Sequence, residues 1–597
     1  MRPLFISDKS ITLTSNKLDW QVLRPQTDNY QHFFSQLPED TSGCFEKIQA
    51  RLADGLQTFS LTTAQPAMML VKIAEYGQYL TLLRDRLMML QADKPPHWCG
   101  GHYSLEGNQA RWRSVETAED NFACLSGQVG VADWIEPEQL FGCVRIFRDN
   151  LTLEPGLLHR INGGTLIISL RAIISQPLMW LRLKQIFLSQ QYIWLSPDET
   201  RALPVSVPAM PLTFRLLIAG DREALAQFQE MEAELSALAI YSEFEENIQI
   251  VDDEEMTDWC QWVREVANRA DIGDIESDFW SQLIIESVRY TGDQETLPLC
   301  PCWLTRQLQD ALIYSEDNRL AASQLKSALE ARAWREGFLA ERMQDEILLD
   351  QILIDTEGAV VGQINGLSVI EFPGHPRPFG EPSRISCVVH PGDGEFTDVE
   401  RKAELGGNIH AKGMMIMQAW LVSELELEQQ LPFSASIVFE QSYSEVDGDS
   451  ASLAELCALI SALANQPVNQ QIAVTGSVDQ FGNVQPVGGL NEKIEGFFQI
   501  CQQRGLNGRQ GVILPASNVR HLALNDDVIN AVREEQFHLW TVSHIEQALP
   551  LLMDKVWNTE RGPCLLRTIQ ERIAQMNQQE NRHRPWPLRW LNWLHHN

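Results

Sequence analysis

Two stretches of this sequence carry residues that could perform nucleophilic chemistry. In the first, Ser450 follows a short acidic loop, and apolar residues recur behind it at helical spacing. The preceding segment 433–440 (FSASIVFE) is apolar and partly β-branched, which predicts a buried strand. A serine between a strand and a helix is exposed, and backbone N–H groups at the helix start can face the oxyanion formed on a carbonyl. We also expect Ser452 and Glu455 to form a capping box at this helix.

The second stretch supplies a candidate base, because a serine hydroxyl is a weak nucleophile on its own. Lys493 opens the segment EKIEGFFQICQQRG, whose apolar residues could bury its amine. Burial would lower the lysine pKa from about 10.4 and leave part of the amine neutral near pH 7. Taken singly, a serine at a helix start is usually a cap and a helix lysine is usually solvated, so only the pair carries weight.

Three segments together resemble the proteolytic domain of Lon proteases, especially those of the Lon-B type. They are FEQSYSEVDGDSASLAEL, VTGSVDQFGNVQPVGGLNEKIEGF and, earlier in the chain, ELGGNIHAKG. The resemblance implies that Ser450 and Lys493 form a Ser–Lys dyad and that Thr475 supports the lysine. One departure is Ser477, because most Lon domains carry glutamate at this position.

Further polar residues around the dyad are candidates for supporting roles. Asp449 and Asp447 either shape the pocket or contact the lysine, and a contact would raise the lysine pKa. Ser442 and Ser444 flank the site and are expected to hydrogen-bond to loops. Lon-type sites use lysine as the base, so His410 is assigned a structural or substrate-side role.

Composition limits the function classes. With 597 residues the chain should form more than one domain, and its net charge of 47 − 80 = −33 argues against general nucleic-acid binding. No apolar run is long enough to span a membrane, and the N-terminus lacks the plan of a signal peptide, so we expect a cytoplasmic protein. The pair Cys300 and Cys302 has neither the spacing nor the second pair of a zinc site, so no metal is expected.

The N-terminal half resembles the ATPase part of Lon-B proteins, but its nucleotide motifs are missing. The pattern from 45 to 90 is helical, and the P-loop GxxxxGK[ST] of the family is expected at 61–69, which reads LTTAQPAMM. The glycines and the lysine are absent there, and Lys72 lies too far along to replace that lysine. No cofactor is therefore expected, since ATP with Mg²⁺, as used in the family, would need these motifs.

A second motif agrees. Segment 165–169 predicts a buried strand, but Ser169 and Leu170 stand where the family has acidic residues that handle Mg²⁺. Asp221 and Arg222 follow another predicted core strand and are interpreted as a strand-end turn rather than as remnants of a site. The acidic residues between 243 and 255 are interpreted as a solvated loop.

The predicted fold class is a multidomain α/β protein: a degenerate AAA-like α/β domain with a helical lid, then a Lon-type α/β proteolytic domain. Segment 352–371 predicts a hairpin that begins the latter, and the lid arginine of the family has only the uncertain counterparts Arg332 and Arg335. The predicted parts are an irregular N-terminal segment (1–44), the degenerate AAA-like core (45–250), the lid-like region (251–340), the proteolytic domain (341–553) and a basic tail (554–597).

The tail contains Trp586, Trp590 and Trp593. Trp590 and Trp593 could share one face of a short helix, which would dock on a neighbouring subunit or lie on a membrane surface. Given the acidic body, docking within an assembly is the preferred interpretation.

The sequence thus predicts a serine endopeptidase that cleaves unfolded or damaged proteins. The resemblance implies assembly as a homo-oligomeric ring. Two alternatives remain open: a non-catalytic scaffold or adaptor that keeps both folds for binding, and an ATP-dependent protease with an atypical nucleotide site.

Overall fold

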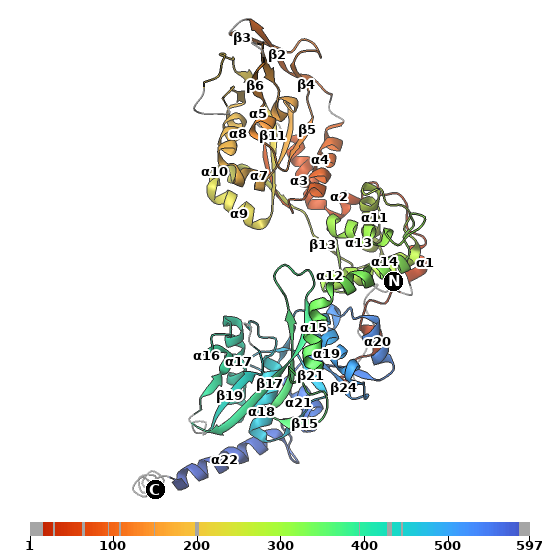
Figure 1. Cartoon of the computed structure of the whole chain (residues 1–597), viewed down its shortest axis with the longest axis vertical. Coiled ribbons are helices and arrows are strands. Elements are labelled where there is room, and N and C mark those ends of the chain that lie inside the picture. The colour runs from red at the N-terminus through yellow and green to blue at the C-terminus, as the bar shows by residue number, and fades with distance from the viewer. Residues whose placement is uncertain are drawn as a thin grey trace.

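In the computed structural model, two α/β bodies lie at opposite ends of an elongated molecule, with a group of helices between them (Figure 1). The structure describes residues 16–27, 30–62, 66–92, 95–106, 109–147, 150–196, 202–392, 394–426, 433–442 and 446–583.

The N-terminal body is built on a five-stranded parallel sheet in the order β12-β1-β11-β8-β5. All six residues of β8 are buried, which confirms the strand predicted at 165–169. The helical pattern predicted from 45 to 90 is wrong in its middle, because Met68–Lys72 forms β1 inside this sheet. The elements are α3 (Ala50–Leu61), β1 (Met68–Lys72), α4 (Gly77–Ala92), β5 (Val129–Ala132), β8 (Gly164–Ser169), α7 (Leu170–Ser175), α8 (Pro177–Ser189), β11 (Phe214–Gly220), α9 (Arg222–Met231), α10 (Ala233–Leu238) and β12 (Ile240–Glu243).

Smaller sheets lie at the far tip of this body (Figure 1). Their elements are β2 (Trp98–Glu106), β3 (Gln109–Ser114), β4 (Phe122–Leu125), β6 (Cys143–Phe147), β7 (Asn150–Glu154), β9 (Gln191–Tyr192) and β10 (Met210–Pro211), with the short helices α5 (Pro137–Phe141) and α6 (Leu157–Arg160).

The central helices confirm the helical character predicted for 256–340. Trp259, Trp262 and Trp280 are fully buried and anchor their core. Asp252 and Glu255 form a capping box at α11, so part of the acidic stretch caps a helix. The elements are α11 (Asp253–Arg269), α12 (Ser277–Thr291), α13 (Pro301–Leu312), α14 (Ala322–Glu336), α15 (Phe338–Leu348), β13 (Asn247–Gln249) and β14 (Thr296–Pro298).

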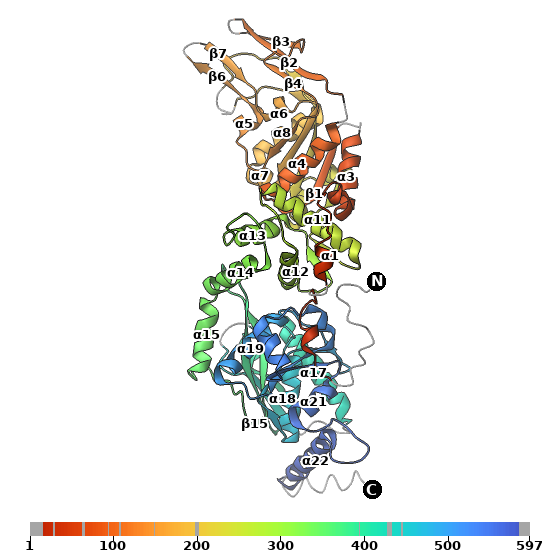
Figure 2. The ribbon, with the colours of Figure 1, turned by 90° about the vertical axis from the view of Figure 1, so that its right-hand side faces the viewer.

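The last of these helices, α15, runs along the C-terminal body (Figure 2). Ile347 packs against Ile354 and against Ile500 of α19. Of the two arginines considered for the lid, Arg332 hydrogen-bonds Gln307 and Asp310 within the helical region, and Arg335 is exposed.

The C-terminal body contains a seven-stranded mixed sheet in the order β18-β19-β17-β16-β21-β24-β25. The strand predicted at 433–440 is confirmed as β19, and the buried strands β24 and β25 complete the sheet. The hairpin predicted at 352–371 is wrong, because β15 pairs with β20, and β16 pairs with the later strand β17. The strands are β15 (Ala359–Val361), β16 (Gln363–Ile370), β17 (Phe379–Pro391), β18 (Phe396–Asp398), β19 (Phe433–Phe439), β20 (Pro467–Asn469), β21 (Ile472–Val474), β22 (Ser477–Val478), β23 (Val484–Gln485), β24 (Gln510–Pro515) and β25 (Phe537–Val542).

Helix α18 is the centre of this body. All thirteen of its residues are buried, which is typical of a helix enclosed by a sheet and by other helices. The helices are α16 (Val399–Lys402), α17 (Asn408–Leu425), α18 (Ser452–Ala464), α19 (Leu490–Arg504), α20 (Asp526–Arg533), α21 (Ile545–Met553) and α22 (Leu565–His583), with a 3-10 turn at Ala516–His521.

The N-terminal segment is more ordered than predicted. Leu18 donates its N–H to the carbonyl of Leu539, so this segment covers the edge of β25, and Leu18 and Leu23 enter the core of the C-terminal body. Phe34 instead packs among the central helices. The segment contains the 3-10 turn η1 (Trp20–Val22) and α1 (Gln31–Phe34), and α2 (Cys44–Ile48) follows.

The segment predicted as a tail from 554 is partly core. Trp557 is buried and donates its indole N–H to Glu424 at 3.1 Å, and Leu565, Ile569 and Ile573 of α22 join the core that encloses α18. Trp586, Trp590 and Trp593 lie outside the described residues.

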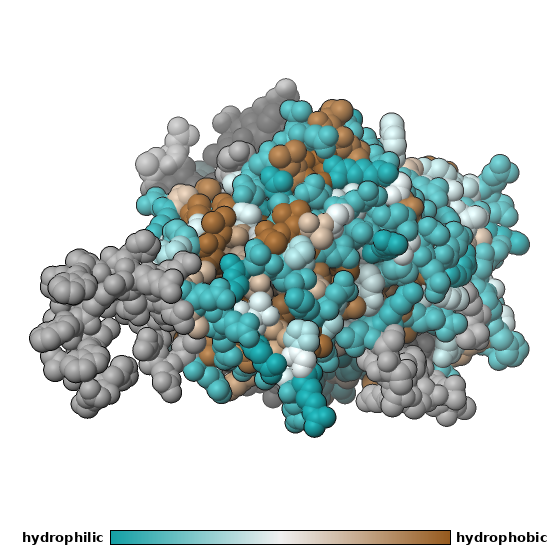
Figure 3. All heavy atoms as spheres, turned by 90° about the horizontal axis from the view of Figure 1, so that it is seen from below, coloured by the Kyte–Doolittle hydropathy of each residue, from teal (hydrophilic) through white to brown (hydrophobic). Residues whose placement is uncertain are grey.

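The surface seen from the α22 end is mostly hydrophilic, with scattered hydrophobic patches (Figure 3). Within the described ranges, no helix is long and apolar enough to cross a membrane. Over the same ranges, no three histidine, cysteine or acidic side chains gather in a way that could hold a metal ion, Cys300 and Cys302 included.

Candidate active site

Ser450 lies in the loop that follows β19, two residues before α18 begins. Its carbonyl accepts the N–H of Gly476 at 2.8 Å, and Leu453 donates its N–H to the carbonyl of Gly476. These two bonds tie the serine loop to the segment after β21. The serine therefore stands on backbone that two separate segments hold in place.

Lys493 lies in the first turn of α19 and reaches Ser450. Its Nζ is 3.0 Å from Ser450 Oγ, and the residue is only 4% exposed. Burial lowers the pKa of Lys493 to about 8, although the charges of Asp449 and Glu492 act in the opposite direction. A lysine with this pKa can accept a proton from a serine hydroxyl near neutral pH.

Thr475 completes the cluster, as the resemblance implied. It is fully buried, and its Oγ1 accepts a hydrogen bond from Lys493 Nζ at 3.4 Å. Ser477 is buried nearby in β22, and no described contact joins it to the lysine.

The two aspartates of the loop have different surroundings. Asp447 Oδ1 accepts the N–H of Ile409 at 3.1 Å, so this carboxylate holds the loop against the start of α17. Asp449 is the acidic residue whose charge acts on Lys493. Between the two options left open by the sequence, Asp447 shapes the loop and Asp449 acts on the lysine.

The capping box predicted for Ser452 and Glu455 is wrong. Ala451 is the N-cap residue of α18. Ser452 Oγ instead accepts the N–H of Val478, and the Glu455 carboxylate lies buried beside His410. Both side chains therefore make contacts with residues distant in sequence and do not form the local cap.

Backbone donors are available beside the nucleophile. Among the described residues, no protein acceptor receives the N–H groups of Asp449 and Ser450. Of the serines flanking the site, Ser442 donates its N–H to Phe439, and Ser444 lies outside the described residues.

Comparison with known proteins shows which family the chain resembles. Residues 440–555 match the Lon protease (S16) C-terminal proteolytic domain, and residues 131–245 match the LonB-like AAA domain. A protein of Escherichia coli (strain K12) named "Putative Lon protease homolog" is 59% identical over 98% of this chain and 100% of its own length. The chain belongs to the Lon protease family.

More distant relatives in the family show how far the likeness extends. A protein of the same name from Haemophilus influenzae is 42% identical over 93% of each chain. The Archaeal Lon protease of Pyrococcus abyssi is 24% identical over 71% of this chain and 41% of its own length. The AAA-like domain and the Lon-type proteolytic domain predicted from the sequence are thus confirmed as the fold class.

In this Lon family member, the loop that corresponds to a P-loop differs from the segment 61–69 expected from the sequence. A P-loop joins a strand to the following helix, and here β1 and α4 are joined by residues 73–76. The expected position 61–69 covers the end of α3 and the start of β1, and residues 63–65 lie outside the described ranges. The loop at 73–76 reads IAEY, so it also lacks the GxxxxGK[ST] pattern.

The carboxylate of Glu75 in this loop accepts two hydrogen bonds from the neighbouring strand end and helix. It accepts the hydroxyl of Ser169 at the end of β8 and, at 2.7 Å, the N–H of Arg171 in α7. Lys72, at the end of β1, is 3.5 Å from Glu246. Asp221 caps α9 through the N–H of Ala224, which agrees with its interpretation as a strand-end turn.

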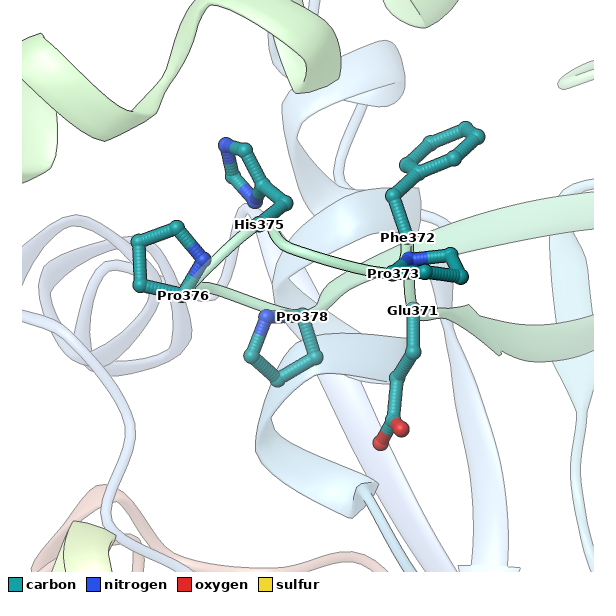
Figure 4. Close-up of a pocket in the computed structure, with 6 residues that line it drawn as sticks. All are labelled: Glu371, Phe372, Pro373, His375, Pro376 and Pro378. Atoms are coloured by element: carbon teal, nitrogen blue, oxygen red, sulfur yellow. The ribbon is translucent and has the colours of Figure 1, made fainter.

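One cavity of the described residues is separate from the Ser450–Lys493 pair. It has a volume of about 390 Å³ and is formed by the proline-rich loop between β16 and β17 (Figure 4). Neither Ser450 nor Lys493 lines it. Its lining residues are Glu371, Phe372, Pro373, His375, Pro376 and Pro378.

Proposed function

We propose that this protein is a serine endopeptidase of the Lon type that hydrolyses peptide bonds of unfolded or damaged proteins. The single observation that supports it best is the 3.0 Å contact between Lys493 Nζ and Ser450 Oγ, made by a lysine whose pKa burial lowers to about 8. A scaffold would have no need to bury an amine against a serine hydroxyl, since that burial costs free energy.

The proposed acylation uses only these groups. Neutral Lys493 takes the proton of Ser450 Oγ as the oxygen attacks the peptide carbonyl, and the N–H groups of Asp449 and Ser450 stabilise the oxyanion. The lysine ammonium then gives its proton to the leaving amine, and an acyl-serine remains. Water, deprotonated by Lys493, releases the second product and restores Ser450. Thr475 orients the amine through its 3.4 Å contact.

We further propose that this chemistry proceeds without nucleotide. The loop after β1 does not fit ATP with Mg²⁺, since the Glu75 carboxylate occupies the donors at Ser169 and Arg171, and a second anion there would be repelled. The AAA-like domain would then serve as a scaffold or gate for substrate. No nucleic-acid partner is expected from an acidic chain of net charge −33. Assembly as a homo-oligomeric ring is proposed from the family.

Degradation of a casein-like unfolded protein tests the proposal. Wild type and Ser450→Ala are compared, each with and without MgATP. Cleavage by the wild type alone, unchanged by MgATP, is the expected result. Equal behaviour of wild type and Ser450→Ala would overturn the peptidase and favour a scaffold, and cleavage that requires MgATP would overturn the nucleotide-independent mechanism.

A further inference from the structure

A buried ionic cluster lies on the far side of the serine loop, outside the Ser450–Lys493 contact. At its centre is His410 in the first turn of α17, 2% exposed. Its Nε2 is 3.3 Å from Asp398 Oδ2, and its Nδ1 is 3.7 Å from Glu455 Oε1. A third carboxylate, that of Glu400, is also buried and accepts the N–H of Phe439 at 2.9 Å. The imidazole therefore contacts two carboxylates, and a third is buried two residues after Asp398.

The charges of the cluster follow from this arrangement. Burial by itself would lower the pKa of His410, but its close contact with Asp398 and the charge of Glu455 outweigh burial and raise that pKa. Burial would raise the pKa of Asp398, but the contact with His410 outweighs it and lowers that pKa. Burial raises the pKa of Glu455 to about 7, against the attraction of His410. His410 therefore pairs with Asp398, the shorter of its two contacts, and the Glu455 carboxyl is partly protonated near neutral pH.

The elements that carry these groups are the ones that hold the nucleophile. Just before His410, Gly407 donates its N–H to the carbonyl of Val446 at 2.9 Å, and Ile409 donates its N–H to Asp447. On the other side, Val446 donates its N–H to the carbonyl of Leu405 at 2.8 Å. The first turn of α17 thus binds the loop immediately ahead of Ser450.

The other end of the cluster reaches the residue after the nucleophile. Glu455 lies in the first turn of α18, and its N–H bonds the carbonyl of Ala451 at 3.0 Å. One turn further along α17, a Cβ added to Gly413 would lie 3.1 Å from Asp449 Cβ, so the helix passes directly against the loop. His410 therefore joins the elements on both sides of Ser450.

We propose that His410 is a positioning residue for Ser450: held between Asp398 and Glu455, it fixes α17 against α18 and so sets the loop 446–450 in reach of Lys493. This inference rests on the proposed function for its catalytic consequence. The structural part, a loop held in place through His410, stands on the contacts alone.

The test uses the full chain with His410→Gln, which keeps an amide of similar reach and removes the charge. We expect kcat on a fluorogenic peptide and the rate of Ser450 labelling by a fluorophosphonate to fall about tenfold, with KM within about twofold. We also expect hydrogen exchange of the amides in 446–453 to accelerate about tenfold, while β24 exchanges as in the wild type. The control is His159→Gln, since His159 is a buried histidine of the N-terminal body at 1% exposure.

A pH profile separates positioning from general support of the fold. The wild type should show two ionisations in kcat, that of Lys493 and that of His410, because loss of the imidazolium proton loosens the loop. His410→Gln should show only the ionisation of Lys493. If His410 were merely structural, its substitution would change Tm, and both proteins would show the single ionisation of Lys493 in kcat.

Several outcomes would overturn the inference. Wild-type kcat, labelling and exchange in a folded His410→Gln would do so, as would an equal loss in His159→Gln. If the single variant does not fold, His410→Gln combined with Glu455→Gln removes the unpaired carboxylate; wild-type exchange at 446–453 in that double variant would again overturn it. If Ser450→Ala cleaves as well as wild type, the proposed function fails, and the exchange data still decide whether His410 holds the loop.

Discussion

Lys493 is subject to opposing demands, and they set the energetics of the candidate site. The amine must be neutral to take a proton, and its burial, at 4% exposure, favours the neutral form. Because the pKa is about 8, the amine is still protonated in most folded molecules near neutral pH, and this buried charge costs free energy. Asp449 and Glu492 limit this cost by favouring the charged form. Burying this lysine thus lowers the stability of the fold and provides a reactive base.

The pH dependence of acylation follows directly. Because only neutral Lys493 accepts the proton, the rate of Ser450 labelling by a fluorophosphonate should rise about tenfold per pH unit below 8 and level off above it, given a pKa of about 8. Stopped labelling reactions between pH 6 and 9.5 measure this. A rate that still climbs at pH 9.5 would mean that Lys493 keeps an ordinary pKa.

Removing the amine should stabilise the fold. The folded-state pKa of about 8 lies below the ordinary lysine pKa of 10.5, so the cost of burying the charge is fully present below pH 8 and disappears as pH rises through 10.5. At pH 7 it amounts to about 3 kcal/mol. Lys493→Met should therefore abolish peptidase activity and raise the Tm of the proteolytic domain by several degrees at pH 7, but by less at pH 10. A lower Tm at pH 7 would contradict this account.

At the scale of elements, the position of Lys493 depends on how closely β17 meets the start of α19. A Cβ placed on Gly380 in β17 would lie 1.9 Å from the carbonyl oxygen of Glu492, so only glycine allows this approach. Arg289 of α12 donates a hydrogen bond to Glu495 of α19 at 2.7 Å, and this bond connects α19 to the central helices. The position of Lys493 therefore depends on β17 and on α12 of the central helices.

Gly380→Ala should displace the first turn of α19. We expect its kcat to fall at least about tenfold, because a shift of about 1 Å in a catalytic group can cost two orders of magnitude. Gly488→Ala is the matched control, since nothing lies within 4 Å of a Cβ added at that glycine. Equal kcat in the two variants would show that the β17–α19 contact does not set the lysine.

At the scale of the whole molecule, both ends of the chain contribute to the proteolytic body. Leu18 pairs with the edge strand β25, and α22 returns to cover the core around α18. An uncovered edge strand is prone to aggregation, so the N-terminal segment protects β25, which is far from it in sequence. The proposed peptidase site therefore depends on segments from both ends of the chain.

Two truncations separate the described part of the C-terminal segment from the rest. Ending the chain at Asp554 removes Trp557, Leu565, Ile569 and Ile573, all of which are buried, and should lower Tm strongly or prevent folding. Ending it at His583 keeps those residues and should leave Tm unchanged, so a change in assembled mass would then report docking by residues 584–597. Sedimentation and thermal unfolding measure both; an unchanged Tm after the Asp554 truncation would refute the core role of α22.

The sequence by itself pointed to the candidate pair Ser450 and Lys493 and to a few of the sheet strands. Ser450, Lys493 and Thr475 were predictable because each lies in a short motif, and β8 and β19 because each is a short apolar run. These are local signals, readable within a few residues of the chain.

Only the tertiary structure decided the rest, because the deciding partners are distant in sequence. Met68–Lys72 is as apolar as a buried helix segment, and its pairing with β11 and β12 makes it a strand. Glu455 suited a local cap, but His410 recruits it to a buried ion cluster. Burial lowers the pKa of Lys493, and long-range contacts place its amine 3.0 Å from Ser450 Oγ; no local pattern encodes either value.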